Sequence, residues 1–204
     1  RSPNLPYKDS ANCLIKRLIS DHTEFEIDHV TDCTLSHKFF TEELCAFASI
    51  YNNEVAAGYD YGIWSLEIDT DINEKQENFI EITTSAWSYT GGAHGNGYLE
   101  IHLIDKKSGA GLSLTDFFSD VDELSAIADP IFRESQGLTF GQDLQNAGFW
   151  FDDGIFRVNE NFSFSDGYVH FLYNPYEIGP YSAGLIEVSV PIDEVKHLLI
   201  RSID

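Results

Sequence analysis

Residues 79–104 read FIEITTSAWSYTGGAHGNGYLEIHLI and contain the clearest structural signal in the chain. The first eleven residues are rich in β-branched and aromatic side chains, which favour a strand, and residues 97–104 partly alternate between apolar and polar. The intervening residues 90–96 include three glycines, which turns favour. The stretch therefore predicts two antiparallel strands joined by a hairpin connection.

The residues before this hairpin predict a mixed amino-terminal region. Residues 61–69 form another strand, which the polar connection 70–78 joins to the first strand of the hairpin. A helix is expected over residues 41–57, with Thr41 as its N-cap and Gly58 as its end. The other expected elements are an arm at residues 1–12 and short strands at 14–19 and 25–30.

The residues after the hairpin predict a second mixed region. A helix is expected over residues 114–135, with a break or kink near Asp129 because Pro130 lies inside it. The other expected elements are strands at 149–158, 162–164, 168–173 and 185–190 and a closing helix at 192–200. The order of elements predicts an α+β fold with two subdomains, each an antiparallel sheet with a packed helix. Their expected limits are residues 1–105 and 106–204, joined in one compact unit.

The charge of the chain is strongly negative. It has 34 Asp and Glu against 12 Lys and Arg, a formal net charge of −22. Such a surface repels nucleic acid and anionic lipid, and it attracts cationic proteins or metal ions. A simpler interpretation is that the charge only keeps the protein soluble. No stretch approaches the roughly 18 apolar residues of a membrane helix.

Three cysteines, Cys13, Cys33 and Cys45, lie in the first quarter of the chain. In an exported protein, a Cys33–Cys45 or a Cys13–Cys33 disulfide is plausible, and one thiol remains. No C-x-x-C pair occurs, so the cysteines give no support to a zinc site. Residues 69–73, DTDIN, imitate the start of a calcium-binding loop, but the later glycine and glutamate positions do not match. A solvated hairpin tip is the simpler interpretation.

Two loops have unusual compositions. Residues 88–96 place four small residues around His94, so the backbone can approach a ligand closely, and His94 is a candidate proton carrier or metal ligand. Residues 173–184 combine two prolines, two glycines and three tyrosines in a rigid, aromatic bend that is typical of binding surfaces. Glu177 is a candidate acid or base. Both loops have a structural alternative, in which they only hold turns together.

These loops resemble one known family. The segments YTGGAHGN at residues 89–96 and PYEIGPY at 175–181, with LSLTDFF at 112–118 and VPIDEV at 190–195, carry the resemblance. They resemble the extracytoplasmic domain shared by RsiV-type anti-sigma factors and PdaC-type peptidoglycan deacetylases. The resemblance covers roughly residues 60–200. The amino-terminal region is similar in layout to the PdaC-type accessory region, and the carboxy-terminal region resembles the RsiV-type part.

The resemblance implies an α+β module outside the cytoplasm, periplasmic or at the cell surface, with a membrane or lipid anchor. In the anti-sigma members this module binds lysozyme. In the deacetylases a separate domain carries the chemistry, so we expect no deacetylase activity here.

We therefore expect a binding or sensing module of the bacterial cell envelope, with a cationic protein such as lysozyme or a cell-wall glycan as its ligand. The alternative is a peptidoglycan-active enzyme in which His94 and Glu177 form an acid–base pair. No cofactor or metal is expected. The residues expected to bind the ligand are Tyr89, Thr90, Gly91, Gly92, His94, Asn96, Tyr176, Glu177 and Tyr181.

Overall fold

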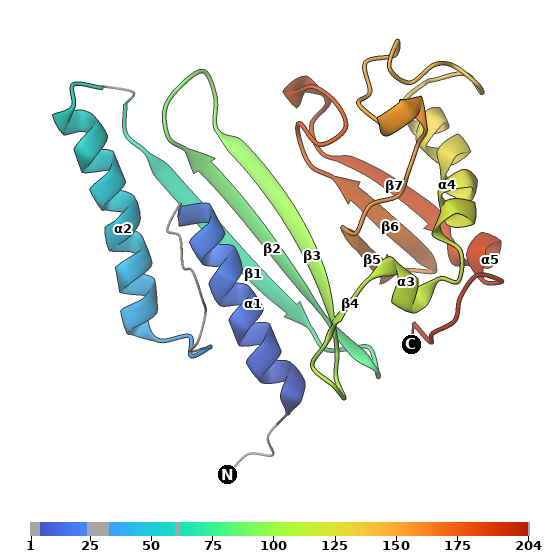
Figure 1. Ribbon diagram of the computed structural model, residues 1–204, viewed down its shortest axis with the longest axis horizontal. Coiled ribbons are helices and arrows are strands. Elements are labelled where there is room, and N and C mark those ends of the chain that lie inside the picture. The colour runs from blue at the N-terminus through green and yellow to red at the C-terminus, as the bar shows by residue number, and fades with distance from the viewer. Residues whose placement is uncertain (1–4, 24–32, 60–61, 204) are drawn as a thin grey trace.

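The computed structural model describes residues 5–23, 33–59 and 62–203. It contains two antiparallel sheets flanked by helices (Figure 1). The second sheet lies between the first sheet and helix α4, and two long helices lie on the far side of the first sheet. The α+β class and the two subdomains are thus confirmed.

The first sheet has four strands in the order β1-β2-β3-β4. Strand β2 spans Phe79–Tyr89 as predicted, and β3 spans Asn96–Asp105. Strand β1 spans Ser65–Asn73, so it begins and ends four residues later than predicted. The short β4, Gly111–Leu112, pairs with β3.

The acidic residues 69–73 lie within β1 and not at a hairpin tip. Neighbouring side chains of a strand point to opposite faces, so this segment does not wrap around an ion as a calcium loop does.

Two helices cover one face of this sheet. Helix α1, Pro6–Thr23, replaces the predicted arm and the predicted strand at residues 14–19. Its buried residues Tyr7, Ala11 and Ile15 repeat at helical spacing and pack on Ile80 and Ile82 of β2. This wider period was missed because residues 14–19 alone are an apolar run without a clear repeat. The strand predicted at residues 25–30 lies outside the described residues.

Helix α2 spans His37–Ala56, and it begins four residues before the predicted start. Its N-cap is Ser36, whose Oγ accepts a hydrogen bond from the backbone N–H of Phe39 at 3.2 Å. Thr41 instead donates to the His37 carbonyl inside the helix. The buried Glu43 accepts a hydrogen bond from Ser20 of α1 at 3.0 Å, which ties the two helices together.

The cysteines of this region form one disulfide, Cys13–Cys33, and leave Cys45 as an exposed free thiol on α2. The structure therefore selects one of the two pairings that the sequence left open. None of the described helices is long and apolar enough to cross a membrane.

The predicted helix at residues 114–135 is two helices. Helix α3, Leu114–Phe117, ends at Phe118, which has an extended backbone, and α4 spans Val121–Ser135. The break comes at Asp120 because this residue caps α4 by accepting a hydrogen bond from the Glu123 N–H at 2.8 Å. The helix does not break near Asp129, since α4 continues through Pro130, and the alternative of a kink there stays a prediction.

The second sheet has three strands in the order β5-β6-β7. They span Phe162–Ser165, Tyr168–Tyr173 and Ile186–Pro191, close to the predicted limits. The strand predicted at residues 149–158 is wrong: this segment is a loop with a 3₁₀ turn, Asp152–Gly154, and its Phe151 and Phe156 fill the core beside Phe132. The closing helix α5 is short, Ile192–Val195.

The main hydrophobic core joins the two sheets. Phe79, Ile101 and Leu103 of the first sheet share one buried cluster with the phenylalanines of the second. The neighbouring residues Ile80 and Ile104 face the smaller cluster under α1. The central strands β2 and β3 are therefore buried on both faces. Because neighbouring side chains of a strand point to opposite faces, alternate residues belong to the two different clusters.

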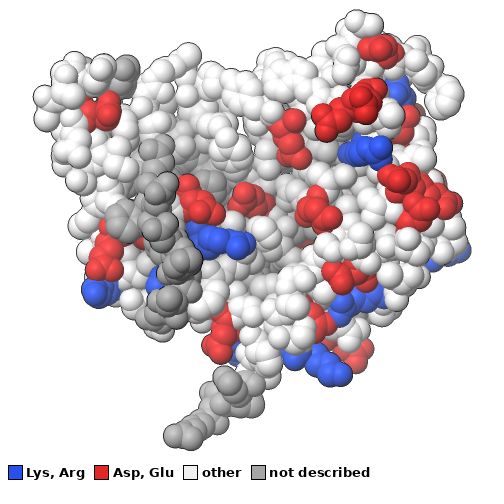
Figure 2. Space-filling view, viewed as in Figure 1, with Lys and Arg blue, Asp and Glu red and all other residues white. Residues whose placement is uncertain are grey.

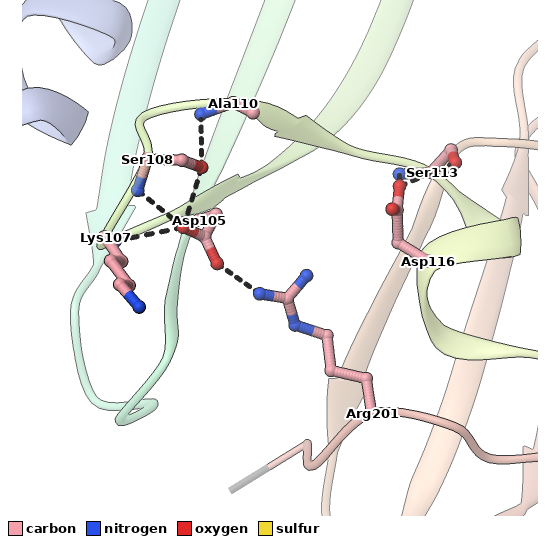
Figure 3. Close-up of polar contacts among 7 residues, drawn as sticks. All are labelled: Asp105, Lys107, Ser108, Ala110, Ser113, Asp116 and Arg201. Carbon is pink, nitrogen blue, oxygen red and sulfur yellow. Dashed lines mark hydrogen bonds and ion pairs between the residues drawn. The ribbon is translucent and has the colours of Figure 1, made fainter.

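A polar cluster ties the carboxy-terminal end to the first sheet. Asp105 ends β3, and its carboxylate accepts hydrogen bonds from the backbone N–H groups of Lys107 and Ser108 and from the Ser108 hydroxyl (Figure 3). The other carboxylate oxygen accepts a hydrogen bond from Arg201. The Ser108 hydrogen bonds, followed by the Arg201 charge, hold the pKa of Asp105 below its usual range.

Replacing Asp105 by asparagine is expected to lower the free energy of unfolding at neutral pH by about 1–3 kcal/mol. Because the folded pKa is depressed, the contribution is present above the unfolded carboxyl pKa of about 3.9 and is lost as pH falls through the folded pKa. Urea unfolding across this pH range should show the two proteins converging in acid. The exposed Asp153, replaced by asparagine, is the control. A stability difference that stays constant in acid would contradict this account.

Candidate functional site

The first unusual loop joins β2 to β3 by a tight path. Gly91 and Gly92 have φ values of 105° and 89°, which other residues rarely adopt. A Cβ at Gly95 would lie 2.4 Å from the Trp87 ring, so only glycine fits there. The Tyr89 hydroxyl donates to the Gly92 carbonyl at 3.2 Å. The loop is thus built to present the exposed His94 on a compact backbone.

The second unusual loop packs directly on the first. The Tyr181 ring stacks on the His94 ring with centroids 3.8 Å apart and an angle of 16° between the planes. The Tyr181 hydroxyl donates to the Gly95 carbonyl at 2.9 Å. Tyr176 lies at the edge of this stack, with its hydroxyl 3.5 Å from His94 Nε2. The three rings His94, Tyr176 and Tyr181 form what we name the aromatic platform.

Two features preorganise the aromatic platform. His94 Nδ1 lies 2.8 Å from the Gly95 carbonyl, which can only accept, so Nδ1 carries a proton. Tyr176 has a φ of 69°, a conformation that is uncommon outside glycine and that the surrounding contacts must hold in place. The residue as a whole is 48% exposed, so part of its surface is available to a ligand.

Glu177 does not join His94. Its Oε1 accepts a hydrogen bond from the Asn159 side chain at 2.6 Å, and its Oε2 accepts one from the Asn174 N–H at 2.8 Å. No hydrogen bond joins Glu177 to His94 in the described part of the chain. The acid–base pair proposed from the sequence thus lacks its required contact, although the two loops do converge.

Glu177 instead lines a crevice of about 280 Å³ between the two sheets. The other polar residues of this crevice come from β3 and from two asparagine-rich turns. They include Glu100 and His102 of β3 and Asn159 and Glu160 of the turn before β5. Three buried atoms of this crevice have no hydrogen-bond partner among the described residues: Glu100 Oε2, His102 Nε2 and Asn159 Oδ1. Burial lowers the pKa of His102, so its neutral form is favoured. The crevice is therefore rich in acceptors.

The face of the molecule that contains β3 carries many acidic side chains, with basic ones among them (Figure 2). Figure 2 shows a hollow between the amino-terminal helices and the carboxy-terminal half, with acidic side chains on both sides of it. Glu100, Glu160 and Glu177 contribute carboxylates from this crevice. A positively charged ligand is the one that such a surface attracts.

The remaining predicted site residues lie in or beside the loop that carries His94. Thr90 is exposed at the end of β2, and Asn96 donates from Nδ2 to the Tyr98 hydroxyl at 2.6 Å. Tyr89, Gly91 and Gly92 shape the loop. The structure thus brings the two predicted loops together, and their role in binding stays a prediction.

The sequence interpretation missed Asn159, Asn161 and Asn174. Asn161 Oδ1 accepts a hydrogen bond from the Ile101 N–H, and Asn174 Oδ1 accepts one from the Leu99 N–H. The run Asn-Glu-Asn at residues 159–161 is a possible signal for this role, but without the fold it is indistinguishable from an ordinary polar turn.

Comparisons with known proteins agree with this fold. A family model described as "Protein of unknown function (DUF3298)" matches residues 115–193. No curated protein matches the chain.

Two solved structures are similar to the chain. A member of the DUF3298 family from Bacteroides fragilis NCTC 9343 is 19% identical, with a TM-score of 0.75, and the match covers 95% of this chain and 79% of that one. A DUF3298 family protein from Pseudomonas aeruginosa PAO1 is 22% identical, with a TM-score of 0.53, and the match covers 74% and 68%. These likenesses concern the fold.

Proposed function

We propose that this chain, which matches the DUF3298 family over residues 115–193, is an extracytoplasmic binding module of the bacterial cell envelope that recognises a cationic protein such as lysozyme. The observation that carries the proposal is the contact between the two loops, in which Tyr181 stacks on His94 beside the exposed ring of Tyr176. The resemblance of both loops to the RsiV-type domain supports the class of ligand.

The aromatic platform supports binding because its rings are already in place. A ring held by stacking and hydrogen bonds loses little conformational entropy when a partner covers it. Tyrosine is also among the residues that contribute most to protein interfaces, since it combines a large apolar ring with a hydroxyl.

The charge supports a basic partner. The net charge of −22 accelerates encounters with cationic proteins, and the crevice next to Glu177 offers carboxylate acceptors to a lysine or arginine side chain. We assign short-range selectivity to the aromatic platform and long-range attraction to the charge.

The test is a calorimetric titration of the domain with lysozyme, with an unrelated protein of similar basic charge as the control. Binding should be selective for lysozyme and should persist at physiological ionic strength, where the Debye length is about 8 Å. Equal binding of both proteins, or binding that salt abolishes, would reduce the interaction to charge attraction alone. Binding to cell-wall glycan fragments but not to lysozyme would replace the proposed ligand.

Replacing Tyr176 by alanine is expected to weaken lysozyme binding at least about tenfold, as for a central interface tyrosine. The matched control is Tyr168→Ala, because Tyr168 is similarly exposed, 41% against 48%, and lies on β6 instead of the aromatic platform. Unchanged affinity of the Tyr176 variant, or equal losses in both variants, would remove the aromatic platform from the binding site.

A further inference from the structure

A second cluster of chemically active side chains lies on the second sheet, outside the aromatic platform. Ser165 comes from β5, His170 from β6 and Glu187 from β7. His170 lies opposite Ser163 of β5 and opposite Ser189 of β7. Ser165 is two residues from Ser163 along β5, and Glu187 is two residues from Ser189 along β7. The side chains of a strand alternate between faces, so all three lie on the same face of the sheet.

The three side chains form a continuous hydrogen-bonded line. The Ser165 hydroxyl lies 2.9 Å from His170 Nε2, and His170 Nδ1 lies 2.9 Å from Glu187 Oε1. Ser189 Oγ also lies 2.9 Å from Nδ1 and donates to Glu187 Oε1 at 2.6 Å. The same order of groups occurs in serine hydrolases. There the hydroxyl is the nucleophile, the imidazole is its base, and the carboxylate orients the base.

The shorter hydrogen bonds favour a proton on Nδ1 of the imidazole. An ionised Glu187 can only accept, and Ser189 already uses its own proton in the bond to Glu187. Nδ1 must therefore donate, which leaves Nε2 of the neutral ring unprotonated. Nε2 lies 2.9 Å from the Ser165 hydroxyl, closer than the 3.3 Å that separates it from the Ser165 carbonyl oxygen, which can only accept. Nε2 then accepts the hydroxyl proton of Ser165, as a general base does.

The surroundings favour this arrangement. The hydrogen bond from Ser189, followed by the interactions with His170, lowers the pKa of Glu187, so the carboxylate stays ionised. The His170 side chain is only 19% exposed, which restricts its orientation, whereas Ser165 is exposed to reactants.

The turn after Ser165 is tight. Asp166 and Gly167 have φ values of 50° and 83°. The N–H of Asp166 directly follows the serine, and in α/β-hydrolases the N–H of the residue after the nucleophile supplies one oxyanion donor.

We infer that Ser165 is an activated nucleophile, with His170 as its general base and Glu187 as the positioning residue, and that it accepts acyl groups from esters of neutral or cationic molecules. The charge restriction follows from the carboxylates of Asp166, Glu187 and Glu81 around the cluster, which repel anions. This activity uses residues that are distinct from those of the proposed binding surface.

The reaction is a balanced acyl transfer. Ser165 Oγ attacks the ester carbonyl carbon while its proton passes to His170 Nε2. The carbon–oxygen bond to the alcohol breaks, and the alcohol leaves with the proton from His170. Water then attacks the acyl-serine, gives one proton to Nε2 and releases the carboxylic acid, and that proton returns to Ser165.

The experiment uses a neutral fluorophosphonate probe, with peptide mapping by mass spectrometry, and hydrolysis of p-nitrophenyl acetate. The probe should label Ser165 in the wild-type chain and in the control Ser163→Ala, which lies on the same strand and face and pairs with His170. Ser165→Ala should lose the labelling while it keeps its thermal unfolding midpoint. Equal labelling of wild type and Ser165→Ala, or no labelling of either, would overturn the inference.

A pH profile separates catalysis from a structural role. A general base must be unprotonated to act, so the labelling rate should be lower in acid than at neutral pH. The titratable groups around the imidazole are Glu187, Tyr168 and, from the first sheet, Glu81.

Glu187→Gln should reduce the labelling rate at least about tenfold, and Glu187→Asp should restore part of it. If the labelling rate is independent of pH, or is equal in the Glu187→Gln variant and the wild type, the cluster has only a structural role in the sheet.

Discussion

Replacing Phe117 by alanine is expected to lower the free energy of unfolding by about 3–5 kcal/mol, the usual cost of removing a buried aromatic ring. Phe117 is fully buried where the two sheets meet, and its ring lies 5.4 Å from Phe79, 5.8 Å from Phe162 and 5.0 Å from Phe164. The substitution leaves a cavity shared by both subdomains, so a single cooperative transition at lower denaturant concentration should be observed.

The matched control for this prediction is Phe140→Ala. Phe140 is 89% exposed, so its removal should change the free energy of unfolding by less than about 0.5 kcal/mol. Chemical unfolding followed by tryptophan fluorescence measures both variants. Equal effects of the two substitutions would contradict the burial that the structure assigns to Phe117, and two separate transitions would contradict the shared core.

Replacing Asn161 by alanine is expected to lower the free energy of unfolding by about 2–3 kcal/mol, because it leaves a buried backbone donor unpaired. The Asn161 side chain accepts from the Ile101 N–H at 2.8 Å and donates to the Leu99 and Leu172 carbonyls at 2.8 Å and 3.0 Å. Both carbonyls receive a second asparagine donor, from Asn174 and Asn159, so the Ile101 N–H is the group that loses its partner.

Hydrogen exchange gives this prediction a local readout. The Ile101 amide should exchange faster in the Asn161→Ala variant by more than the global loss of stability explains. Asn146→Ala, at an exposed loop position, serves as the control. If the Ile101 amide remains as protected as in the wild type, relative to its neighbours, then the asparagine does not hold the two sheets together.

The sequence predicted correctly those elements in which composition and side-chain periodicity are clear within a short stretch of the chain. Strand β2 matched its predicted limits because Phe79–Tyr89 combines β-branched and aromatic residues between two turns. Strand β6 matched for the same reason. Helix α1 was missed because its buried stripe extends from Tyr7 through Ala11 to Ile15, beyond the short window that suggested a strand.

Elements whose structure depends on distant partners could not be predicted. The segment at residues 149–158 has the aromatic content of a strand, but its phenylalanines pack around Phe132 of α4 without pairing with another strand. For the candidate site, the two loops were recognisable from glycine, proline and tyrosine content, whereas the stacking of Tyr181 on His94 required the fold. The same holds for Glu177, which pairs with asparagines and not with His94.

The amino-acid sequence alone therefore determined the α+β class, the central hairpin and the identity of two preorganised loops, because turns and side-chain alternation depend on residues close together in the chain. The tertiary structure decided which side chains meet. Asn161 reaches Ile101 across 60 positions, and Ser165, His170 and Glu187 align only because three strands pair in one register. Such contacts follow from strand pairing and core packing, which no local pattern specifies.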